Sequence, residues 1–388
     1  MATRVVPLAG NRFALRRAEE AARRSARLTV ALLIPVGLLA VVGLGAILSS
    51  SSVYALEAQQ DSLFYFKRQL IWLGGGIVGL AAAAALPLRW WRRLAFPFFS
   101  LTVLLLVAVQ LVGTRVGGAE RWLSVGPIGL QPSEFAKLAT VLFLATLVSR
   151  REDSMHRFRD FFWPVAGSVG VVGALVILQP DLGTTLLIAA GGFAVLIASA
   201  APLAFVLGGG LIGAGGAVAA ALLSPYRWER VTSFLDVTAD PLGSGYQAMQ
   251  SLVALGTGGL FGVGLGASRA RWSFLPNAHT DFIFAIVGEE TGLAGTLAVV
   301  LLFIVFTVAG TLVALHSTDR FGRLVAIGIT TWLAAQALVN VGGVTGVLPI
   351  TGVPLPFVSF GGSALLTEMV GVGILVGIVR QPPSPERA

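Results

Sequence analysis

The chain has 388 residues, of which 55% are hydrophobic and only 12% are charged, and its mean hydropathy is +0.84. A soluble globular domain carries about twice that charged fraction, so the composition excludes an ordinary soluble enzyme and indicates an integral membrane protein. The absence of Cys excludes disulfides and thiolate metal sites. The formal charge of +8 and the pI near 10.9 raise the question of nucleic-acid binding, which the distribution of the charge answers below.

Apolar runs recur from end to end of the chain, and a membrane-spanning helix needs roughly 20 mostly apolar residues. Ten runs meet this requirement approximately, which predicts an all-α membrane domain over residues 28–380, an Arg-rich tail at 1–27 and a disordered tail at 381–388. The ten runs are Leu28–Leu48, Gln69–Leu86, Leu94–Val112, Phe135–Val148, Phe162–Leu178, Leu182–Ser199, Leu203–Leu223, Phe282–Leu315, Leu324–Val344 and Gly361–Val379. The eighth run is too long for one upright span, so it has to tilt or to begin in a cavity or loop.

Lys and Arg are unevenly shared between the two sets of loops, and basic loops favour the cytoplasmic side of a membrane. If the N-terminus lies inside, 18 of the 27 Lys and Arg residues fall on the inner side. This bias predicts ten spans with both termini in the cytoplasm. The basic charge is therefore mostly a topology signal, and no nucleic-acid partner is expected.

Two predicted outer segments, 113–134 and 224–280, are too long to be simple turns. Such a long loop inside a compact domain is usually functional or disordered. The segment 224–280 is too apolar and too rich in Gly, Trp and Tyr for disorder. We expect it to pack on the outer face, with a helical piece near 247–255.

Three carboxylates, those of Asp281, Glu289 and Glu290, lie at the start of the eighth run. A carboxylate near hydrocarbon is costly and usually faces a cavity or a partner. On one helix, Asp281 and Glu289 would lie about 12 Å apart along the axis and roughly 80° apart around it, which allows both to line one cavity. The competing interpretation is that Asp281 only caps the helix, a role worth about 1 kcal/mol. Glu289 and Glu290 are expected to support or tune the site.

A second polar group comprises Arg121 and the segment Gln131-Pro132-Ser133-Glu134, which is typical of a helix start, with Lys137 one turn further on. An Arg, a Lys and a helix N-terminus on the outer face would suit a diphosphate. In the competing interpretation, Glu134 only complements the helix dipole and Arg121 is an interfacial anchor.

Three further segments carry polar residues. Asp181 lies in the turn 179–185, where it either caps the next helix or faces a cavity. The segment 226–251 interleaves basic and aromatic residues, which suits a sugar or a protein partner better than nucleic acid. The segment 348–363, which contains Ser359, has three Pro and three Gly within an apolar stretch, and such non-helical backbone is tolerated at membrane depth only against protein or a wet cavity. With three His in the chain, a His-based metal site is not expected.

The sequence from Pro276 to Phe284 resembles the signature of the SEDS family, the polytopic peptidoglycan glycosyltransferases that include FtsW and RodA. The four other motif groups resemble SEDS motifs in the same order, so the similarity extends over about residues 65–378. The runs 226–235 and 262–269 are similar to the FtsW division enzymes, and the Gly-Thr-Gln element usual in RodA is absent. Phe360 stands where the family more usually has Tyr, and Asn277 where it often has an acidic residue.

The resemblance implies that the protein polymerises lipid II at the outer face of the bacterial cytoplasmic membrane. In that reaction the GlcNAc 4-hydroxyl of the acceptor attacks the anomeric carbon of the donor MurNAc, configuration inverts, and undecaprenyl diphosphate leaves. Asp281 is then the general base, and Arg121 and Lys137 are candidates for the cations at the diphosphate. The other residues expected at the substrate are Gln131, Glu134, Asp181, His279, Thr280, Glu289 and Ser359.

The resemblance also implies a class B penicillin-binding protein, a transpeptidase, as partner, together with other division proteins. It leaves room for a divalent cation such as Mg²⁺ or Mn²⁺ on the diphosphate, for which the sequence gives no ligand set. Three alternatives remain: a lipid II flippase, for which the same polar cavity would serve translocation, a RodA-type elongation polymerase, and a division scaffold for which Asp281 is dispensable.

Overall fold

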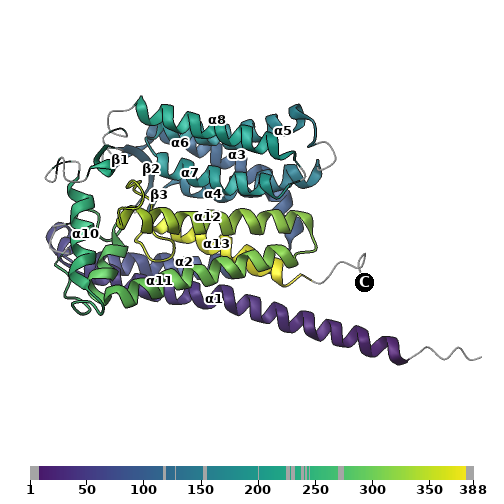
Figure 1. The fold of residues 1–388 in the computed structure, drawn as a ribbon, viewed down its shortest axis with the longest axis horizontal. Helices are drawn as coiled ribbons and strands as arrows, with labels where there is room; N and C mark the ends of the chain where they lie inside the picture. The colour runs from purple at the N-terminus through teal and green to yellow at the C-terminus, as the bar shows by residue number, and fades with distance from the viewer. Residues whose placement is uncertain are drawn as a thin grey trace, which may run out of the picture.

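The computed structural model describes residues 8–381 apart from 117–118, 127, 152–154, 200, 224–227, 229–231, 237–239, 241–242, 244 and 270–274. It is a bundle of long helices with a small sheet at one end (Figure 1). The helices are α1 (Leu8–Gln59), α2 (Phe64–Ala85), α3 (Leu88–Val112), α4 (Pro132–Arg150), α5 (Phe158–Val165), the π-helical turn η2 (Ala166–Gly170), α6 (Val171–Leu178), α7 (Leu182–Ile197), α8 (Leu203–Leu222), α10 (Tyr246–Gly258), α11 (Ile283–His316), α12 (Arg320–Val344) and α13 (Gly362–Val379). The strands are β1 (Thr114–Val116), β2 (Ala119–Val125) and β3 (Ile128–Leu130).

The predicted all-α membrane fold is confirmed. Within the described residues, eight helical stretches are long and apolar enough to cross a membrane, with α5, η2 and α6 forming one of them, and α7 and α8 are shorter apolar helices. These ten stretches correspond in order to the ten predicted runs. That all ten cross the membrane stays a prediction, because helix length and composition alone do not show a crossing.

The helices run roughly parallel between two ends of the bundle (Figure 1). The start of α1 and the end of α13 point to the same end, which we call the terminal end, and α1 projects beyond the other helices there. The three strands, α10 and the segments 259–269, 275–282 and 345–361 lie at the opposite end, which we call the loop end. Termini at the same end agree with an even number of crossings.

Two stretches differ in local structure from the expectation. The helix α1 already begins at Leu8 and continues through the Arg-rich segment, because Ala, Arg and Glu in that segment are good helix formers. Within the predicted outer segment 113–134, β1, β2 and β3 form an antiparallel sheet in that order. In the segment 224–280, α10 covers the predicted helical piece, and much of 224–244 lies outside the described residues.

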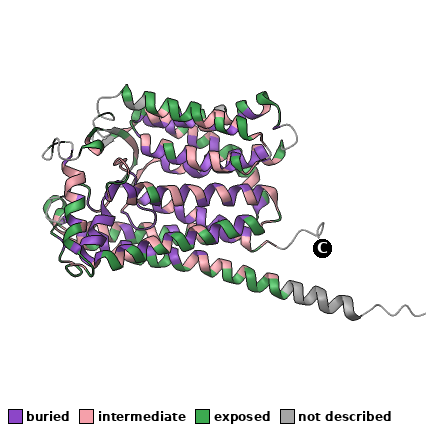
Figure 2. Ribbon diagram, viewed as in Figure 1, coloured by how far each residue is buried: buried purple, intermediate pink, exposed green. Residues whose placement is uncertain are grey.

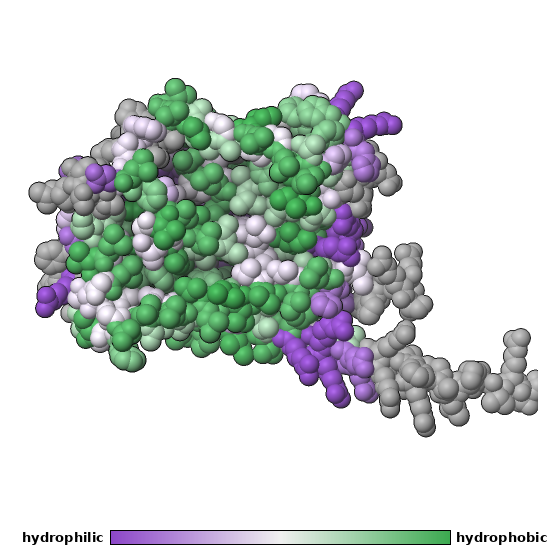
Figure 3. All heavy atoms as spheres, in the orientation of Figure 1, coloured by the Kyte–Doolittle hydropathy of each residue, from purple (hydrophilic) through white to green (hydrophobic). Residues whose placement is uncertain are grey.

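Burial is greatest in α4, α12 and α13, and the outer helices are far more exposed (Figure 2). In α4 and α13, 78% of the most apolar window is buried, against 17% in α2. The exposed sides of the bundle are apolar, while hydrophilic side chains gather at the terminal end (Figure 3). A large exposed apolar surface is unfavourable in water and suits a lipid-facing belt.

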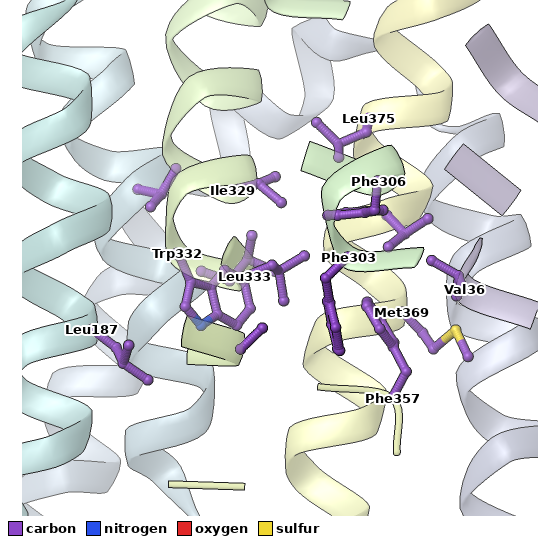
Figure 4. Packing of buried hydrophobic residues seen from close by; sticks show 14 of the residues in the cluster. Val36, Leu187, Phe303, Phe306, Ile329, Trp332, Leu333, Phe357, Met369 and Leu375 are labelled. Carbon is purple, nitrogen blue, oxygen red and sulfur yellow. The ribbon is translucent and has the colours of Figure 1, made fainter. Parts of the chain in front are cut away.

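The Pro- and Gly-rich segment 349–361 is non-helical, as predicted, and its middle is buried among helices. Figure 4 shows Phe357 of this segment among buried side chains such as Phe303 and Met369, and its ring lies 6.0 Å from that of Phe306 on α11. Close contact with α1 depends on Gly43, where a Cβ would lie 2.5 Å from the carbonyl oxygen of Val358. The segment is thus part of the core and not a surface loop.

The long eighth run was expected to tilt or to begin in a cavity or loop, and the structure shows instead a kink within α11, at the non-helical residue Gly292 with φ +68°. The segment 259–264 packs into this kink: the amide of Leu293 donates to the carbonyl of Gly259 at 2.9 Å, and the amide of Val263 donates to that of Glu289 at 2.9 Å. A Cβ on Gly292 would lie 2.4 Å from the amide nitrogen of Gly262, so only Gly fits. The kink separates a short helix that carries Glu289 and Glu290 from the long helix that follows.

Candidate functional site at the loop end

The turn 277–282, which precedes α11, carries Asp281 at the loop end. The carbonyl of Asn277 accepts hydrogen bonds from the amides of Thr280 and Asp281, both at 3.1 Å. The N-cap of α11 is Phe282, and no side chain caps the helix. Asp281 therefore does not occupy the N-cap position. Asp281 is partly exposed, so a substrate hydroxyl has access to this part of the molecule.

Ser359 and Phe360 of the buried segment hold the turn of Asp281 from one side. The Ser359 hydroxyl donates to the carbonyl of Thr280 at 2.6 Å and accepts the amide of Leu355 at 2.8 Å. The Phe360 amide donates to the carbonyl of His279 at 3.0 Å. The sequence prediction grouped Ser359, His279, Thr280 and Asp281, and the structure brings these four residues together. Since the Ser359 hydroxyl is already used for two backbone bonds, its contacts indicate a supporting role.

The ring of His279 lies within an aromatic cluster. Its centroid is 4.7 Å from that of Tyr65, 5.9 Å from that of Tyr54 and 5.9 Å from that of Phe360. Burial lowers the pKa of His279 to about 4, because the charged imidazolium is poorly solvated there. The ring is therefore neutral near pH 7, and it contributes shape and stacking rather than a positive charge beside Asp281.

Arg121 and Asp181 meet at the turn between α6 and α7. Arg121 donates from Nε to the carbonyl of Gln179 at 2.9 Å and from a terminal nitrogen to that of Pro180 at 2.6 Å. Its other terminal nitrogen lies 3.8 Å from a carboxylate oxygen of Asp181, which caps α7 by accepting the amide of Thr184 at 3.0 Å. The capping interpretation of Asp181 is confirmed. The Arg121 side chain remains 25% exposed, so it stays a candidate for binding an anionic group of the substrate.

Lys137 lies inside the bundle rather than at its surface. Its side chain has 0% exposure, and its ammonium is 2.7 Å from a carboxylate oxygen of Glu134. The same ammonium donates to Gln336 Oε1 at 2.9 Å and lies 5.3 Å from the ring centroid of Trp332. The prediction that Lys137 holds the diphosphate stays a prediction, and in this structure the ammonium is enclosed by these partners.

Gln131 is the N-cap residue of α4, and Pro132 follows at the first helical position, as the sequence predicted. The amide of Gln131 donates to the Ser363 hydroxyl of α13 at 3.1 Å, and its side chain donates to Ser133 at 3.2 Å. Glu134 lies in the first turn of α4, but its side chain is only 3% exposed and is paired with Lys137. This pairing is a more specific role than complementing the helix dipole.

Glu289 and Glu290 bind protein groups beyond the turn of Asp281. The carboxylate of Glu289 accepts the hydroxyl of Ser268 and, at 3.0 Å, the amide of Arg269. Glu290 accepts the hydroxyl of Ser49 on α1. Both are buried, at 2% and 5% exposure, so the contacts that the structure gives them tie the loop and α1 to the kinked helix. They agree with the expected supporting role.

Three residues that sequence reasoning missed complete this region: Gln336 and Asn340 on α12 and Glu368 on α13, all buried. Their signal in the sequence is a polar residue within an apolar run: Gln336 and Asn340 lie about one helical turn apart in one run, and Glu368 lies in the last run. Within the described part of the chain, no group of three or more His, Asp or Glu side chains is arranged to hold a metal ion.

Comparisons with known proteins identify the family of this fold and site. A family model described as "Cell cycle protein", named for FtsW, RodA and SpoVE, matches residues 29–383. The chain belongs to this family. The matched residues include almost the whole helical bundle.

Relatives within the family carry names from different processes. The chain is 40% identical to stage V sporulation protein E of Bacillus subtilis over 345 residues, which cover 88% of this chain and 94% of that protein. It is 37% identical to a probable peptidoglycan glycosyltransferase FtsW of Trichlorobacter lovleyi, with 92% of this chain and 94% of that one covered.

Solved structures agree in fold. A chain described under "Structural coordination of polymerization and crosslinking by a peptidoglycan synthase complex" superposes with a TM-score of 0.74 at 31% identity, covering 90% of this chain and 96% of that one. The rod shape determining protein RodA of Thermus thermophilus superposes with a TM-score of 0.68 at 28% identity and covers the same shares.

Proposed function

We propose that this protein is a peptidoglycan glycosyltransferase that polymerises lipid II, with Asp281 as its general base. The observation that carries the proposal is the partly exposed carboxylate of Asp281 in a turn whose backbone is held by buried groups, in a family whose members are named peptidoglycan glycosyltransferases. A fixed base next to an open surface is what one inverting displacement requires.

In the proposed reaction, Asp281 removes the proton of the acceptor's GlcNAc 4-hydroxyl as its oxygen attacks the anomeric carbon of the donor MurNAc. The bond from that carbon to the diphosphate oxygen breaks, and undecaprenyl diphosphate leaves with the electron pair. Negative charge grows on the diphosphate, so a cation nearby lowers the barrier. Arg121 is the candidate with an exposed part. A divalent cation such as Mg²⁺ or Mn²⁺ would have to be held mainly by the diphosphate itself.

We place the loop end, and with it Asp281, outside the bacterial cytoplasmic membrane, with both termini in the cytoplasm. The bias of Lys and Arg towards the terminal end supports this orientation. The absence of Cys permits a direct test: Phe261→Cys at the loop end should react with an impermeant maleimide added to intact cells, and His156→Cys at the terminal end should not. The reverse labelling would overturn the orientation.

We propose a class B penicillin-binding protein as partner and septal wall synthesis as the process, with other division proteins nearby. A structural relative is described as part of a complex that coordinates polymerisation and crosslinking, which supports a transpeptidase partner. Relatives named FtsW support division, whereas sporulation protein E supports a sporulation role for a related polymerase. Depletion of the protein in its own host distinguishes these roles by filamentation, loss of rod shape or a defect confined to spores.

The central experiment is polymerisation of purified lipid II by the purified protein, with and without the transpeptidase, followed on a gel that resolves glycan strands. Glycan strands that depend on the protein support the proposal. The flippase alternative predicts translocation of lipid II across proteoliposomes without glycan formation, and the scaffold alternative predicts neither activity. The polymerisation and translocation assays use the same preparation of purified protein, so their results can be compared directly.

A further inference from the structure

The backbone of the turn that carries Asp281 is held at three successive carbonyl groups. The carbonyl of His279 accepts the Phe360 amide at 3.0 Å, and that of Thr280 accepts the Ser359 hydroxyl at 2.6 Å. The carbonyl of Asp281 itself accepts a hydrogen bond from the Asn340 side chain at 2.8 Å. Every donor in this set comes from α12 or from the non-helical segment that follows it.

Asn340 is the residue that joins Asp281 to that segment. It is 4% exposed, and its side-chain NH₂ group donates one hydrogen to Asp281 O and the other to Val353 O, both at 2.8 Å. One planar amide thus bridges Asp281 and the segment 349–361, in addition to the direct bonds that Ser359 and Phe360 make to the turn. A hydrophobic residue of similar size would leave two carbonyl groups without this donor.

The same segment is held from behind by Gln336 and Glu368. Gln336 Nε2 donates to the carbonyl of Pro354 at 3.0 Å and to Glu368 Oε1 at 2.8 Å. The other oxygen of Glu368 accepts the amide of Phe357 at 3.0 Å. Gln336 Oε1 accepts from Lys137 Nζ and from Trp332 Nε1, each at 2.9 Å, so all the hydrogen-bonding capacity of this side-chain amide is used.

On the other side of the segment, Gln69 of α2 donates to the carbonyl of Ser359 at 3.2 Å and accepts the amide of Gly361 at 3.4 Å. Three helices, α2, α12 and α13, therefore direct side chains to one buried piece of backbone, and Lys137 of α4 joins them through Gln336. That backbone has few internal hydrogen bonds of its own, so these side chains define its position.

We infer that Asn340, Gln336 and Glu368 are positioning residues that fix Asp281 through the segment 349–361, and that Lys137 acts on the reaction through this buried network. The inference rests on the proposed role of Asp281 as base. A buried polar network in which every group is hydrogen-bonded fixes one geometry, whereas a network that has lost a partner allows several geometries. A displacement of about 1 Å at a reacting group can cost roughly 100-fold in rate.

The first test is Asn340→Leu, which removes both donors and keeps the branched shape and the number of heavy atoms of the side chain. We expect kcat for lipid II polymerisation to fall by about 10- to 100-fold, with KM for lipid II within about threefold of wild type, because substrate contacts remain while the base is displaced. Gln110→Leu is the matched control: Gln110 also donates to a carbonyl, that of Leu175 at 3.1 Å, but on α3 away from this network. It should retain wild-type kinetics.

If Asn340→Leu fails to yield folded protein, Ser359→Ala replaces it, since that change removes only one hydroxyl. A positioning role lowers kcat, whereas a direct contact of Ser359 with substrate raises KM. A kcat within twofold of wild type in the folded variant, or a change confined to KM, would overturn the inference.

The second test exchanges the two partners of the network. Gln336→Glu places a carboxylate against Glu368 and should lower kcat. The double change of Gln336→Glu with Glu368→Gln restores one donor and one acceptor between α12 and α13 and leaves the net charge unchanged. We expect kcat of the double variant to recover to within about fivefold of wild type, as coupled neighbours do in a double-mutant cycle. A double variant no better than Gln336→Glu alone would overturn the coupling.

Asp281→Asn, assayed in parallel, separates the two levels of the proposal. If this variant polymerises normally, the assignment of the base is wrong whatever the network does. If it is inactive while Asn340→Leu and the exchange variants behave like wild type, the base stands and the positioning network is refuted.

Discussion

Asp281 and the pair Glu289 and Glu290 have the same chemistry and lie within ten residues of one another, yet the structure uses them differently. The glutamates are almost completely buried and accept hydrogen bonds from Ser268, from the backbone of Arg269 and from Ser49. Asp281 is partly exposed, and it is its backbone carbonyl that is bound by a buried side chain. In the first case the protein uses the carboxylate to hold other segments. In the second, Asn340 on another helix holds the backbone of the residue that carries the carboxylate.

This comparison shows why charge within an apolar run is an incomplete guide to catalysis. A buried carboxylate must be satisfied by donors, and a carboxylate whose oxygens serve the fold has little capacity left for a substrate. A general base needs the opposite arrangement, with a fixed backbone and an accessible oxygen. The kink at Gly292 belongs to the first arrangement, because the segment 259–264 packs into it and Ser268 and Arg269 of the same loop bind the buried Glu289.

The largest effect is expected for Asp281→Asn. The substitution keeps the size of the side chain and removes the proposed base, and loss of a general base typically costs about 10²–10⁴-fold in rate. Thermal stability and lipid II binding should stay close to wild type. The measurements are initial rates of glycan formation and the unfolding midpoint in detergent. Near-normal polymerisation by a folded variant would mean that Asp281 is not the base and does not differ in this respect from Glu289 and Glu290.

The next largest effect, a loss of stability, is expected for Gly292→Ala. The positive φ costs roughly 1–3 kcal/mol for a residue with a Cβ, and here the Cβ would also overlap the backbone of Gly262. We expect a clear drop in the unfolding midpoint and increased proteolysis of the segment 259–269. The matched control is Gly74→Ala on α2, where a Cβ meets nothing within 4 Å and should be neutral or stabilising. Equal stability of both variants would mean that the kink does not depend on Gly.

A smaller effect is expected for Glu289→Gln. One amide oxygen still accepts the Arg269 amide, but the second acceptor is lost, and breaking a buried hydrogen bond of this kind costs about 1–3 kcal/mol. The unfolding midpoint should fall while kcat stays within about tenfold of wild type. A variant with wild-type stability and no polymerisation would place Glu289 in the chemistry, beside Asp281, and would remove the contrast.

The smallest effect concerns pH. Because burial holds the pKa of His279 at about 4 in the folded protein against 6.5 in the unfolded chain, the neutral ring contributes stability above pH 6.5, and this contribution is lost as the pH falls towards 4. The unfolding midpoint should therefore fall less between pH 7 and pH 5 in His279→Phe than in wild type. His156→Phe is the control, since His156 is exposed. Identical slopes for wild type and His279→Phe would show that the ring is not held neutral by burial.

The sequence alone determined the class of the fold, because apolar runs of spanning length are a local property that hydrocarbon selects directly. It likewise determined the start of α4 at Pro132 and the non-helical character of 349–361, since Pro and Gly act locally on the backbone, whereas the kink at Gly292 was not predicted. The residues around Asp281 were also identified from the sequence, and their grouping with Ser359 agrees with the contacts observed.

Tertiary structure alone decided which polar residues face one another. Lys137 and Gln336 are 199 positions apart in the chain, and no local rule states that the ammonium of one is buried against the amide of the other. The sequence therefore placed Lys137 at an outer surface, missed Gln336, Asn340 and Glu368, and left open whether Asp281 was a helix cap. Burial and long-range hydrogen bonding arise only when α4, α12 and α13 pack together, and these two properties decide which carboxylates are buried among protein donors and which, like that of Asp281, stay partly exposed.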